Sequence, residues 1–464
     1  MQPSSQVPFE THAAIYSVSL LIIFKLVKSL FSNIPKLFSN AIYQSFIIFL
    51  AGLCIKDKNL SAHGIAEYFG IKSHDALSHI FYHKCWSASL LMFELLNQAI
   101  QLSTTLNLPG WLIIDDVMLP KGRSFHTAGV YWDYDYVNDK YILCLRLVVI
   151  AWSNGFIRIP VAFAPYYKKG SLYLKTQNKK FRTKNQLAQT LVYRVLRKGL
   201  HFDYVTFDSW YASAENFNCF NRFNVIFIAA LKSNRHIRWP FNPIENKPKR
   251  KCKDLKWHTL TCSEWAAERP YVRDYHYYKK LDARARQDLM FVKDVYVLLK
   301  VVCIKNYAKT NAFKDIHTKA DKRAKDPNKY LVTNCIDLTI PQIVSYYRTR
   351  WTIEVILRDC KQQFGLGKCQ AHKSMEPHLR YTAMGFLAFT LLELTKAKVN
   401  CSTIGDIKRY LQNQQLICLN GTFHIVDIST IKLNWDHVNY FSQVIDFNDI
   451  NDRETQLVFN FNSV

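Results

Sequence analysis

The most informative part of this sequence is SYYRTRWTIEVILRDCKQQFG, residues 345–365. On one α-helix over about 341–363, at about 100° per residue, four polar side chains fall within an arc of roughly 60°: Tyr347, Arg350, Glu354 and Lys361. A carboxylate on such a face can hold a metal ion, while the cations and the phenol can hold phosphate oxygens. The alternative is a solvated stripe on a surface helix. The apolar residues around the stripe favour a packed helix that faces a site.

The pattern resembles the Tyr-Arg-Glu-Lys signature of bacterial insertion-sequence transposases of the Asp-Asp-Glu class. Within this class it is similar to the group whose catalytic core carries a long β insertion before the Glu. The resemblance covers about residues 100–400. It implies that Glu354 is one of three metal-binding carboxylates and that Tyr347, Arg350 and Lys361 contact DNA. The chain must then supply two aspartates on suitable elements.

The first aspartate is expected in WLIIDDVMLPKG, residues 111–122. Its apolar start predicts a buried strand that ends in Asp115 and Asp116. Because side chains alternate along a strand, only one of the two faces a given ligand. The family pattern places its Asp directly before two small or apolar residues, which selects Asp116. Val117 departs from the Thr that family members often have after this Asp. The alternative is that both acids merely end the strand.

The second aspartate is expected in FDYVTFDSWYASAENF, residues 202–217. Tyr204 to Phe207 predicts a short strand and Asp208 follows it. Open sheets bind ligands at the carboxyl ends of their central strands, which favours a functional Asp208. The alternative is an Asp that starts the next helix.

The order of the elements points to the same fold. Strands are predicted at 111–117, 142–151, 156–163, 204–208 and 225–231, and helices at 184–198, 211–222 and 341–363. This order is typical of the ribonuclease-H-like fold, in which an Asp on the first strand, an Asp after the fourth strand and an acid on a later helix form the site. Asp116, Asp208 and Glu354 occupy these places. The predicted class is α/β, with a ribonuclease-H-like core, a β-rich insertion and an N-terminal α-helical domain.

The resemblance also implies a reaction. Two Mg²⁺ ions, which Mn²⁺ can replace, would be held by Asp116, Asp208 and Glu354 for phosphoryl transfer on DNA. The expected substrates are double-stranded DNA at the element's terminal inverted repeats and the target DNA. Cut-and-paste movement through a hairpin and a homodimer in the synaptic complex are implied as well.

Two other functions fit the same residues. One is a catalytically inactive repressor on a transposase scaffold, against which the retained acids argue. The other is a structure-selective nuclease with this core and no strand transfer. Mg²⁺-dependent nicking of end DNA would exclude the inactive repressor. Detection of products joined to target DNA would exclude the nuclease without strand transfer.

Composition favours a polyanionic partner. The chain of 464 residues carries a net charge of +25, and 49% of its residues are hydrophobic. This predicts a globular protein of more than one domain that binds nucleic acid.

The twelve cysteines form no Cys-x2-Cys pair, which argues against a zinc site. No membrane span is expected, because apolar runs at 16–31 and 43–54 are too short or interrupted by Lys. The expected location is the bacterial cytoplasm, on the nucleoid.

The predicted organisation has five parts: a helical DNA-binding domain at 1–105, the first part of the core at 106–231, the insertion at 232–340, the helical second part of the core at 341–400, and a tail at 401–464 that could make a subunit contact. Residues 60–86 suggest a helix-turn-helix with its turn at Gly70, or merely two packed helices. The insertion holds 25 Lys and Arg against 12 Asp and Glu, which favours a surface that follows DNA over solvated loops. The resemblance implies that an aromatic residue of the insertion can hold a flipped base. The candidates are its three tryptophans, Trp239, Trp257 and Trp265, which otherwise belong to the core.

Overall fold

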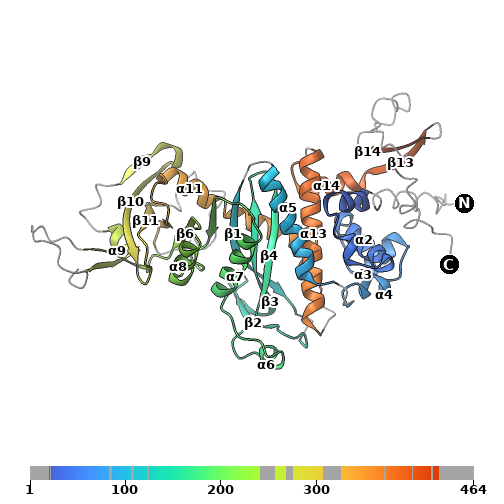
Figure 1. Ribbon diagram of the computed structural model, residues 1–464, viewed down its shortest axis with the longest axis horizontal. Coiled ribbons are helices and arrows are strands. Elements are labelled where there is room, and N and C mark those ends of the chain that lie inside the picture. Colours follow the sequence, from blue (N-terminus) through green and yellow to red (C-terminus); the bar gives the residue numbers. More distant parts are fainter. Residues whose placement is uncertain are drawn as a thin grey trace, which may run out of the picture. The chain divides into compact units, whose positions relative to one another are not determined.

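The computed structural model describes residues 20, 22–82, 86–105, 109–122, 125–136, 138–240, 257–267, 275–306, 326–369, 373–399, 401–419 and 422–427. The chain divides into two compact units, and their elements are labelled in Figure 1. Unit 1 comprises Met1–Gln98, Pro120–Cys144 and Arg358–Val464. Unit 2 comprises Ala99–Leu119 and Leu145–Leu357. The five-part organisation expected from the sequence stays a prediction.

Unit 2 is built on a large mixed sheet. Its strands are β1 (Trp111–Pro120), β3 (Lys140–Ser153), β4 (Arg158–Tyr166), β5 (Tyr204–Phe207), β6 (Phe227–Leu231), β7 (His236–Pro240), β8 (Trp257–Thr261), β9 (His276–Tyr278), β10 (Ala283–Val292), β11 (Leu299–Ile304) and β12 (Lys329–Thr333). They follow the order β3-β1-β5-β6-β12-β11-β10-β7-β8, while β4 pairs with β3 and β9 pairs with β10. Strands β1, β5 and β6 run parallel, and β12 pairs antiparallel with β6. Strands β7 to β12, which follow β6 in the chain and precede the signature region (residues 345–365), therefore extend the same sheet.

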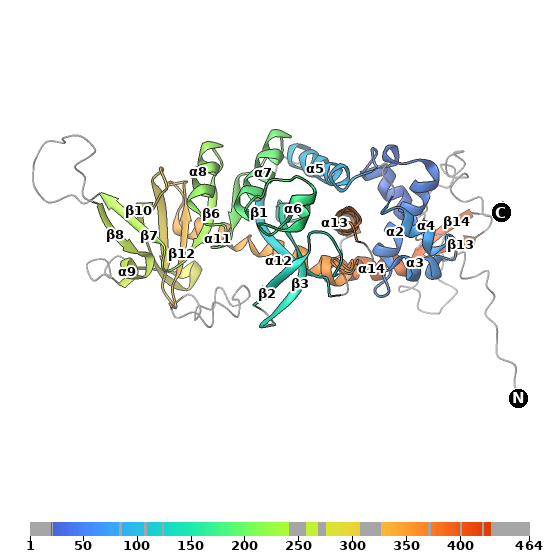
Figure 2. The same ribbon diagram turned by 90° about the horizontal axis from the view of Figure 1, so that it is seen from below.

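The two faces of this sheet pack against different helices. On one face, Tyr204 and Ile228 join a buried cluster with Ile343 and Val344 of α11 (Ile340–Arg348). Because side chains alternate along a strand, Phe207 and Phe227 point to the other face. There Phe207 and Phe227 contact Phe217 of α8 (Ala214–Arg222). Figure 2 shows α8 and α7 (Lys184–Arg197) on one side of β6 and β1 and α11 on the other.

The strands and helices expected around the first part of the core are found within a few residues of their predicted bounds. Strand β2 (Tyr131–Asp135) and the helices α6 (Leu172–Thr176) and α9 (Cys262–Ala267) were not expected. Strands β7 and β8 were also missed, whereas β9, β11 and β12 fall within 271–280, 288–304 and 329–334, the stretches of the insertion for which the sequence predicts β structure. Two runs that contribute to the positive charge of the insertion, Lys247-Pro248-Lys249-Arg250-Lys251 and Lys322-Arg323-Ala324-Lys325, lie outside the described residues.

Unit 1 is mostly helical. Its elements include η1 (Pro35–Leu37), α2 (Asn40–Ile55), α3 (Ala62–Phe69), α4 (His74–His79), α13 (Met375–Val399), α14 (Ile404–Gln412), and the strand pair β13 (Gln414–Leu419) and β14 (Thr422–Asp427). Helix α5 (Ala88–Thr105) begins in unit 1 and ends in unit 2. The Arg380 guanidinium donates to the Phe81 carbonyl at 2.7 Å, and Phe46 packs edge-on against Trp86. These contacts tie α2 and α13 to the chain that follows α4.

Two short helices separated by a turn at Gly70 lie between residues 60 and 82, and this arrangement fits both expected interpretations, a helix-turn-helix and two packed helices. Gly70 ends α3 with a φ of 67°, a left-handed conformation that suits Gly, and the Ser73 hydroxyl accepts the Ala76 N–H to start α4. The predicted apolar residues Leu77, Ile80 and Phe81 are buried. Contact of this unit with DNA remains a proposal.

None of the helices in the described part of the chain combines the length and the apolar character needed to cross a bilayer. The run at 43–54 lies within α2, where it is buried, and the run at 16–31 falls partly outside the described residues.

Candidate active site

Strand β1 brings Asp115 and Asp208 to neighbouring positions. Strands β1 and β5 are parallel with Ile114 opposite Phe207, so the next residues, Asp115 and Asp208, follow in register. Both carboxylates lie at the carboxyl ends of these paired stretches, where open sheets place their ligands. Burial raises the pKa of Asp115 to about 8, and the negative charge of Asp208 adds to this effect.

Backbone donors fix the Asp208 carboxylate. Its Oδ1 accepts the N–H groups of Trp210 at 3.0 Å and Tyr211 at 3.3 Å. Burial raises the pKa of Asp208, although Arg350 and these backbone bonds act in the opposite direction. The alternative expected from the sequence was a residue that starts α8, but Ser213 caps that helix instead, by accepting the Asn216 N–H.

Asp115 points to the face of the sheet that α11 covers. Trp111, four residues earlier and on the same side, stacks on Tyr204, which in turn stacks on Tyr346 of α11. The Tyr204 hydroxyl also lies 3.3 Å from the Thr349 hydroxyl. Residue 350 is thereby held near the point where β1 stops pairing with β5, and Arg350 Nη1 lies 3.7 Å from Asp115 Oδ2.

Glu354 meets the same arginine from the other side. It lies in the first turn of α12 (Trp351–Gln363), and its Oε1 accepts a hydrogen bond from Arg350 Nη2. The Arg350 side chain is only 12% exposed, so its charge is poorly screened by water. We call this arrangement, with Arg350 between Asp115 and Glu354, the Arg350 bridge.

Asp116 points to the opposite face of β1 and has different partners. Its Oδ2 lies 2.5 Å from Arg146 Nη1 on β3 and 3.2 Å from Lys184 Nζ in the first turn of α7. The Tyr211 hydroxyl donates to its Oδ1 at 3.4 Å. Lys184 is placed by a capping box in which Thr183 and Gln186 begin the helix. Asp115, rather than the predicted Asp116, is therefore the carboxylate that faces Arg350 and Glu354.

The signature region is not the single helix that was expected. Helix α11 ends at Arg348 and α12 begins at Trp351, and the residues between them form tight turns. The Thr349 hydroxyl donates to the Tyr346 carbonyl at 2.6 Å, and Arg350 N–H bonds back only three residues, to Tyr347. Such side-chain and three-residue bonds bend a helix. The break between α11 and α12 therefore determines how Arg350 is placed relative to Glu354. A single regular helix face does not.

The other two signature residues differ in exposure. Tyr347 is buried in the cluster between α11 and the sheet, with the Lys329 ammonium 5.8 Å from its ring centre. Lys361 is exposed near the end of α12, in the part of the helix that belongs to unit 1. Of the residues selected from the sequence, the structure brings Arg350 into contact with Glu354, and Asp208 into register beside Asp115.

The donor set suits a hard divalent cation by its chemistry, since Asp115, Asp208 and Glu354 offer carboxylate oxygens. Within the described residues, however, no three His, Cys, Asp or Glu side chains lie together as a metal site requires. Arg350 is the cation that contacts Asp115 and Glu354.

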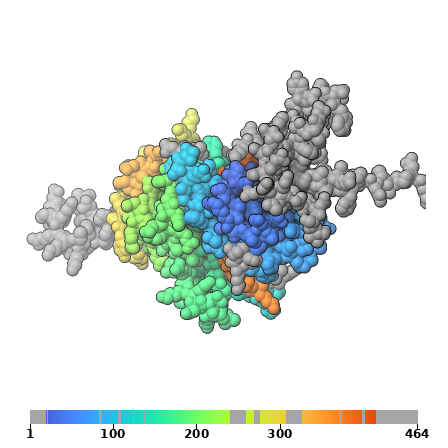
Figure 3. All heavy atoms as spheres, turned by 45° about the vertical axis from the view of Figure 1, so that its right-hand side comes forward, coloured from blue at the N-terminus to red at the C-terminus, as the bar shows by residue number. Residues whose placement is uncertain are grey.

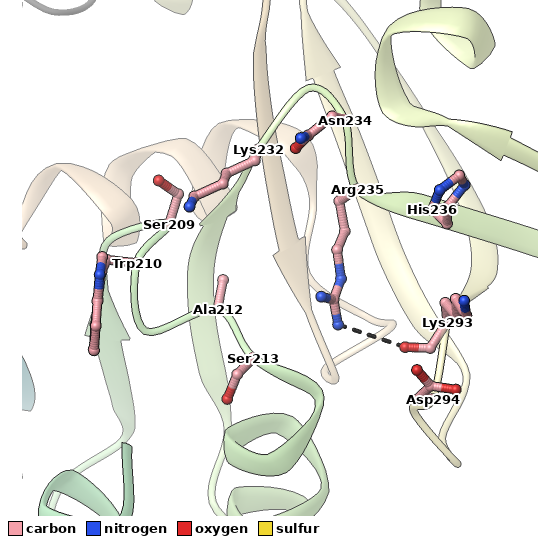
Figure 4. A pocket seen from close by; sticks show the side chains of 10 residues that line it. All are labelled: Ser209, Trp210, Ala212, Ser213, Lys232, Asn234, Arg235, His236, Lys293 and Asp294. Atoms are coloured by element: carbon pink, nitrogen blue, oxygen red, sulfur yellow. Dashed lines mark hydrogen bonds between the residues drawn. The ribbon is translucent and has the colours of Figure 1, made fainter. Parts of the chain in front are cut away.

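A basic pocket lies directly beyond Asp208. Its cavity, of about 340 Å³, is lined by Ser209, Trp210, Ala212, Ser213, Lys232, Asn234, Arg235, His236, Lys293 and Asp294. Figure 4 shows Lys232 reaching toward Ser209 and Arg235 donating to the Lys293 carbonyl, at 3.5 Å. Lys232 and Lys293 are exposed at the pocket and Asp294 is the one acid in its lining, so the pocket is suited to an anion.

Sequence reasoning missed Arg146, Lys184 and the pocket. Arg146 left a signal, because it is the lone charge in the apolar run 142–152 and a buried charge needs a counter-charge. Lys184 left only a weak signal, since basic residues are unremarkable at any exposed helix start. The pocket residues come from separate turns, and the sequence gives no indication that these turns meet.

The large mixed sheet, with acids where β1 and β5 stop pairing, fits a nuclease-type core. Two family models match the chain: one, described as DDE superfamily endonuclease, covers residues 36–258, and the other, described as transposase DDE domain, covers residues 180–376. Asp115, Asp116 and Asp208 fall in the first match, and Asp208 and Glu354 in the second. The matches support a DDE transposase or DDE endonuclease, a class that acts on DNA and generally uses divalent metal ions. No curated protein matches the chain.

Proposed function

We propose that this protein is a DNA transposase of an insertion sequence, in the Tyr-Arg-Glu-Lys group, that cuts the element's ends and joins them to target DNA. The single observation that carries the proposal is the meeting of Asp115, Arg350 and Glu354 beside Asp208. The strand order β4-β3-β1-β5-β6, with β1, β5 and β6 parallel, supports a ribonuclease-H-like core. The bacterial nucleoid is the proposed place of action.

The proposed catalytic carboxylates are Asp115, Asp208 and Glu354. They would hold Mg²⁺, which supplies activation of the attacking oxygen and stabilisation of the leaving oxygen. Asp116 is proposed to stabilise the core, since it ties β1 to β3 and α7 through Arg146 and Lys184. Arg350, Lys361 and Tyr347 are proposed to contact phosphates near the scissile bond, which would place that bond at the carboxylates.

The basic pocket supports a DNA substrate. Trp210 and Ser209 line it and follow Asp208 directly, so an anion in the pocket lies close to the proposed site. Phosphates of the strand next to the scissile bond are the proposed occupants, held by Lys232, Arg235 and Lys293. Cut-and-paste movement and a homodimer on paired ends complete the proposal.

The test is to incubate the protein with DNA of its flanking element ends, a target plasmid and Mg²⁺, and to map products to the nucleotide. Cuts at the element ends and joined products are expected, and both should disappear with Asp208→Asn. Cuts without joined products would identify a nuclease instead. Binding of the ends without any cut would identify a repressor.

A further inference from the structure

The chain between β4 and α7 carries an unusual concentration of positive charge. Residues 166–184, the basic segment, hold seven Lys and Arg and no Asp or Glu. Five of the lysines are exposed: Lys168, Lys169, Lys175, Lys179 and Lys180. In the space-filling view of Figure 3, the part around α6 (green) stands out from the surface. Cations clustered without counter-charges on a projecting surface attract a polyanion.

Aromatic contacts give the basic segment a defined form. Tyr167 packs on Tyr173 with 4.5 Å between ring centres. Lys179 Nζ donates to the Tyr173 hydroxyl at 3.3 Å. The segment ends at Lys184, which contacts Asp116 and lies 4.3 Å from the centre of the Trp210 ring. The side chains of the basic segment therefore pack on one another, and its last residue contacts Trp210, which lines the basic pocket beyond Asp208.

We propose that the basic segment is a DNA-binding surface that contacts the phosphates of the duplex backbone independently of the base sequence. The exposed cations are mainly lysines, which contact phosphates as point charges, whereas base recognition relies more on Arg, Asn and Gln in fixed geometry. The inference rests on the proposed function and adds a contact that none of the signature residues supplies. Its loss lowers affinity equally for element ends and for unrelated duplexes.

The test compares two fourfold variants in the full-length protein. In the first, Lys168, Lys169, Lys179 and Lys180 are changed to Gln. In the matched control, four exposed cations on α7, at its C-terminal cap and on α8 are changed to Gln: Arg194, Arg197, Lys198 and Arg222. Affinity for an element-end duplex and for a random duplex is measured across a salt series, with melting curves to confirm folding.

In the first variant the slope of log affinity against log salt should fall by about 0.9 for each lost phosphate contact, by roughly two or more in total, on both duplexes. The control should keep the wild-type slope. An unchanged slope in the first variant, or an equal loss in the control, overturns the inference. Cutting at saturating DNA and low salt tests the proposed function separately, because absence of cutting by the wild type would defeat that function and leave the slopes unaffected.

The Arg350 bridge carries a second, independent inference. Arg350 contacts Asp115 at 3.7 Å and also bonds Glu354, so one guanidinium lies between two of the three proposed metal-binding carboxylates. A guanidinium is a planar, permanent cation that pairs well with both carboxylates and phosphates. The three carboxylates do not form a metal site together in the described residues, and Arg350 is the group that contacts two of them.

We infer that Arg350 takes the place of a cation between Asp115 and Glu354 when DNA is absent, and moves to a phosphate when DNA binds. This inference also rests on the proposed function and concerns the regulation of its site. Metal and DNA then bind cooperatively, because each favours the form in which the Arg350 bridge is open. By linkage, DNA increases metal affinity by the same factor as metal increases DNA affinity.

Mn²⁺ binding, followed by electron paramagnetic resonance, tests the bridge without a cutting assay. Wild type and Arg350→Gln are titrated with Mn²⁺ alone and then with Mn²⁺ at saturating pre-cut end duplex. Without DNA, Arg350→Gln should bind Mn²⁺ at least about fivefold more tightly than wild type, the lower end of common coupling between sites. The duplex should tighten Mn²⁺ binding to wild type and have little effect on the variant.

Arg348→Gln is the control, because it removes the same charge from an exposed position two residues away. Equal Mn²⁺ affinity of wild type and Arg350→Gln without DNA, or an equal gain in Arg348→Gln, overturns the bridge. Failure of the proposed function looks different: Asp208→Asn would then leave Mn²⁺ binding unchanged in every form of the protein.

Discussion

Asp115 and Asp116 are adjacent in sequence and opposite in environment. Asp115 faces Arg350 and lies beside Asp208, and its pKa is raised. Asp116 lies among Arg146, Lys184 and the Tyr211 hydroxyl. A carboxylate that lies beside another acid gains from binding a cation. A carboxylate that is already paired with two cations gains little from binding a metal ion. The two sides of one strand thus separate a reactive site from a structural ion-pair network.

The largest expected difference between the two sides is in DNA cutting. Asp115→Asn should lower the cutting rate by about a thousandfold or more, because weakening a metal site removes several kcal/mol of transition-state stabilisation. Asp208→Asn and Glu354→Gln should behave alike, with binding of end DNA nearly intact. Asp116→Asn should retain most of the cutting at temperatures where it is folded. The opposite result, with cutting lost in Asp116→Asn and kept in Asp115→Asn, would restore the choice made from the sequence.

Asp116→Asn should instead show its effect in stability. The side chains of Arg146, Lys184 and Asp116 are 14%, 13% and 11% exposed, so the amide would remove the negative charge that Asp116 presents to two nearly buried cations. Breaking a buried pair costs about 3 kcal/mol or more. Urea unfolding of Asp116→Asn and Asp115→Asn measures the difference. A smaller loss in Asp116→Asn than in Asp115→Asn would mean that the network on its side contributes little to the fold.

Arg350→Ala should lower cutting by about a hundredfold, because a misplaced phosphate costs roughly that much even when the metal site is intact. Lys361→Ala should have a smaller effect, since Lys361 is exposed. Arg348→Ala is the control for both. Cutting rates and melting temperatures are compared for all three variants. If Arg348→Ala cuts as poorly as Arg350→Ala, the signature spacing has no special role.

The sequence could predict the elements of the core and two of the three proposed carboxylates. Local patterns define them: apolar runs mark the strands, and Asp208 and Glu354 follow from position after a strand and from helix spacing. The choice between Asp115 and Asp116 could not follow from local pattern. Alternation shows that they face opposite sides, but only the packing of α11 and Tyr346 on Tyr204 shows which side meets Arg350.

The helix break at Thr349 was likewise invisible to periodicity. A regular arc of about 100° per residue assumes an unbroken helix, whereas the Thr349 side chain bonds to the Tyr346 carbonyl. For Arg146 the sequence does give a signal. A single charge in an apolar strand indicates that a counter-charge lies nearby, but it does not indicate which residue supplies it. Distant pairing of this kind depends on the fold and not on spacing.

The Asp115 side of the strand should also show a pH dependence of stability. Burial, aided by Asp208, raises the pKa of Asp115 from 3.8 to about 8. Between these values the folded protein binds more protons than the unfolded chain, so the free energy of unfolding should fall as pH rises from about 4 to about 8 and then level off. Asp115→Asn removes this carboxyl, and its stability should vary less over the same window. Melting temperatures at about pH 5 and about pH 8, without metal, measure the fall in wild type, Asp115→Asn and Asp116→Asn. A fall that survives in Asp115→Asn but disappears in Asp116→Asn would show that the proton is held on the other side of the strand, and the contrast between the two aspartates would be reversed.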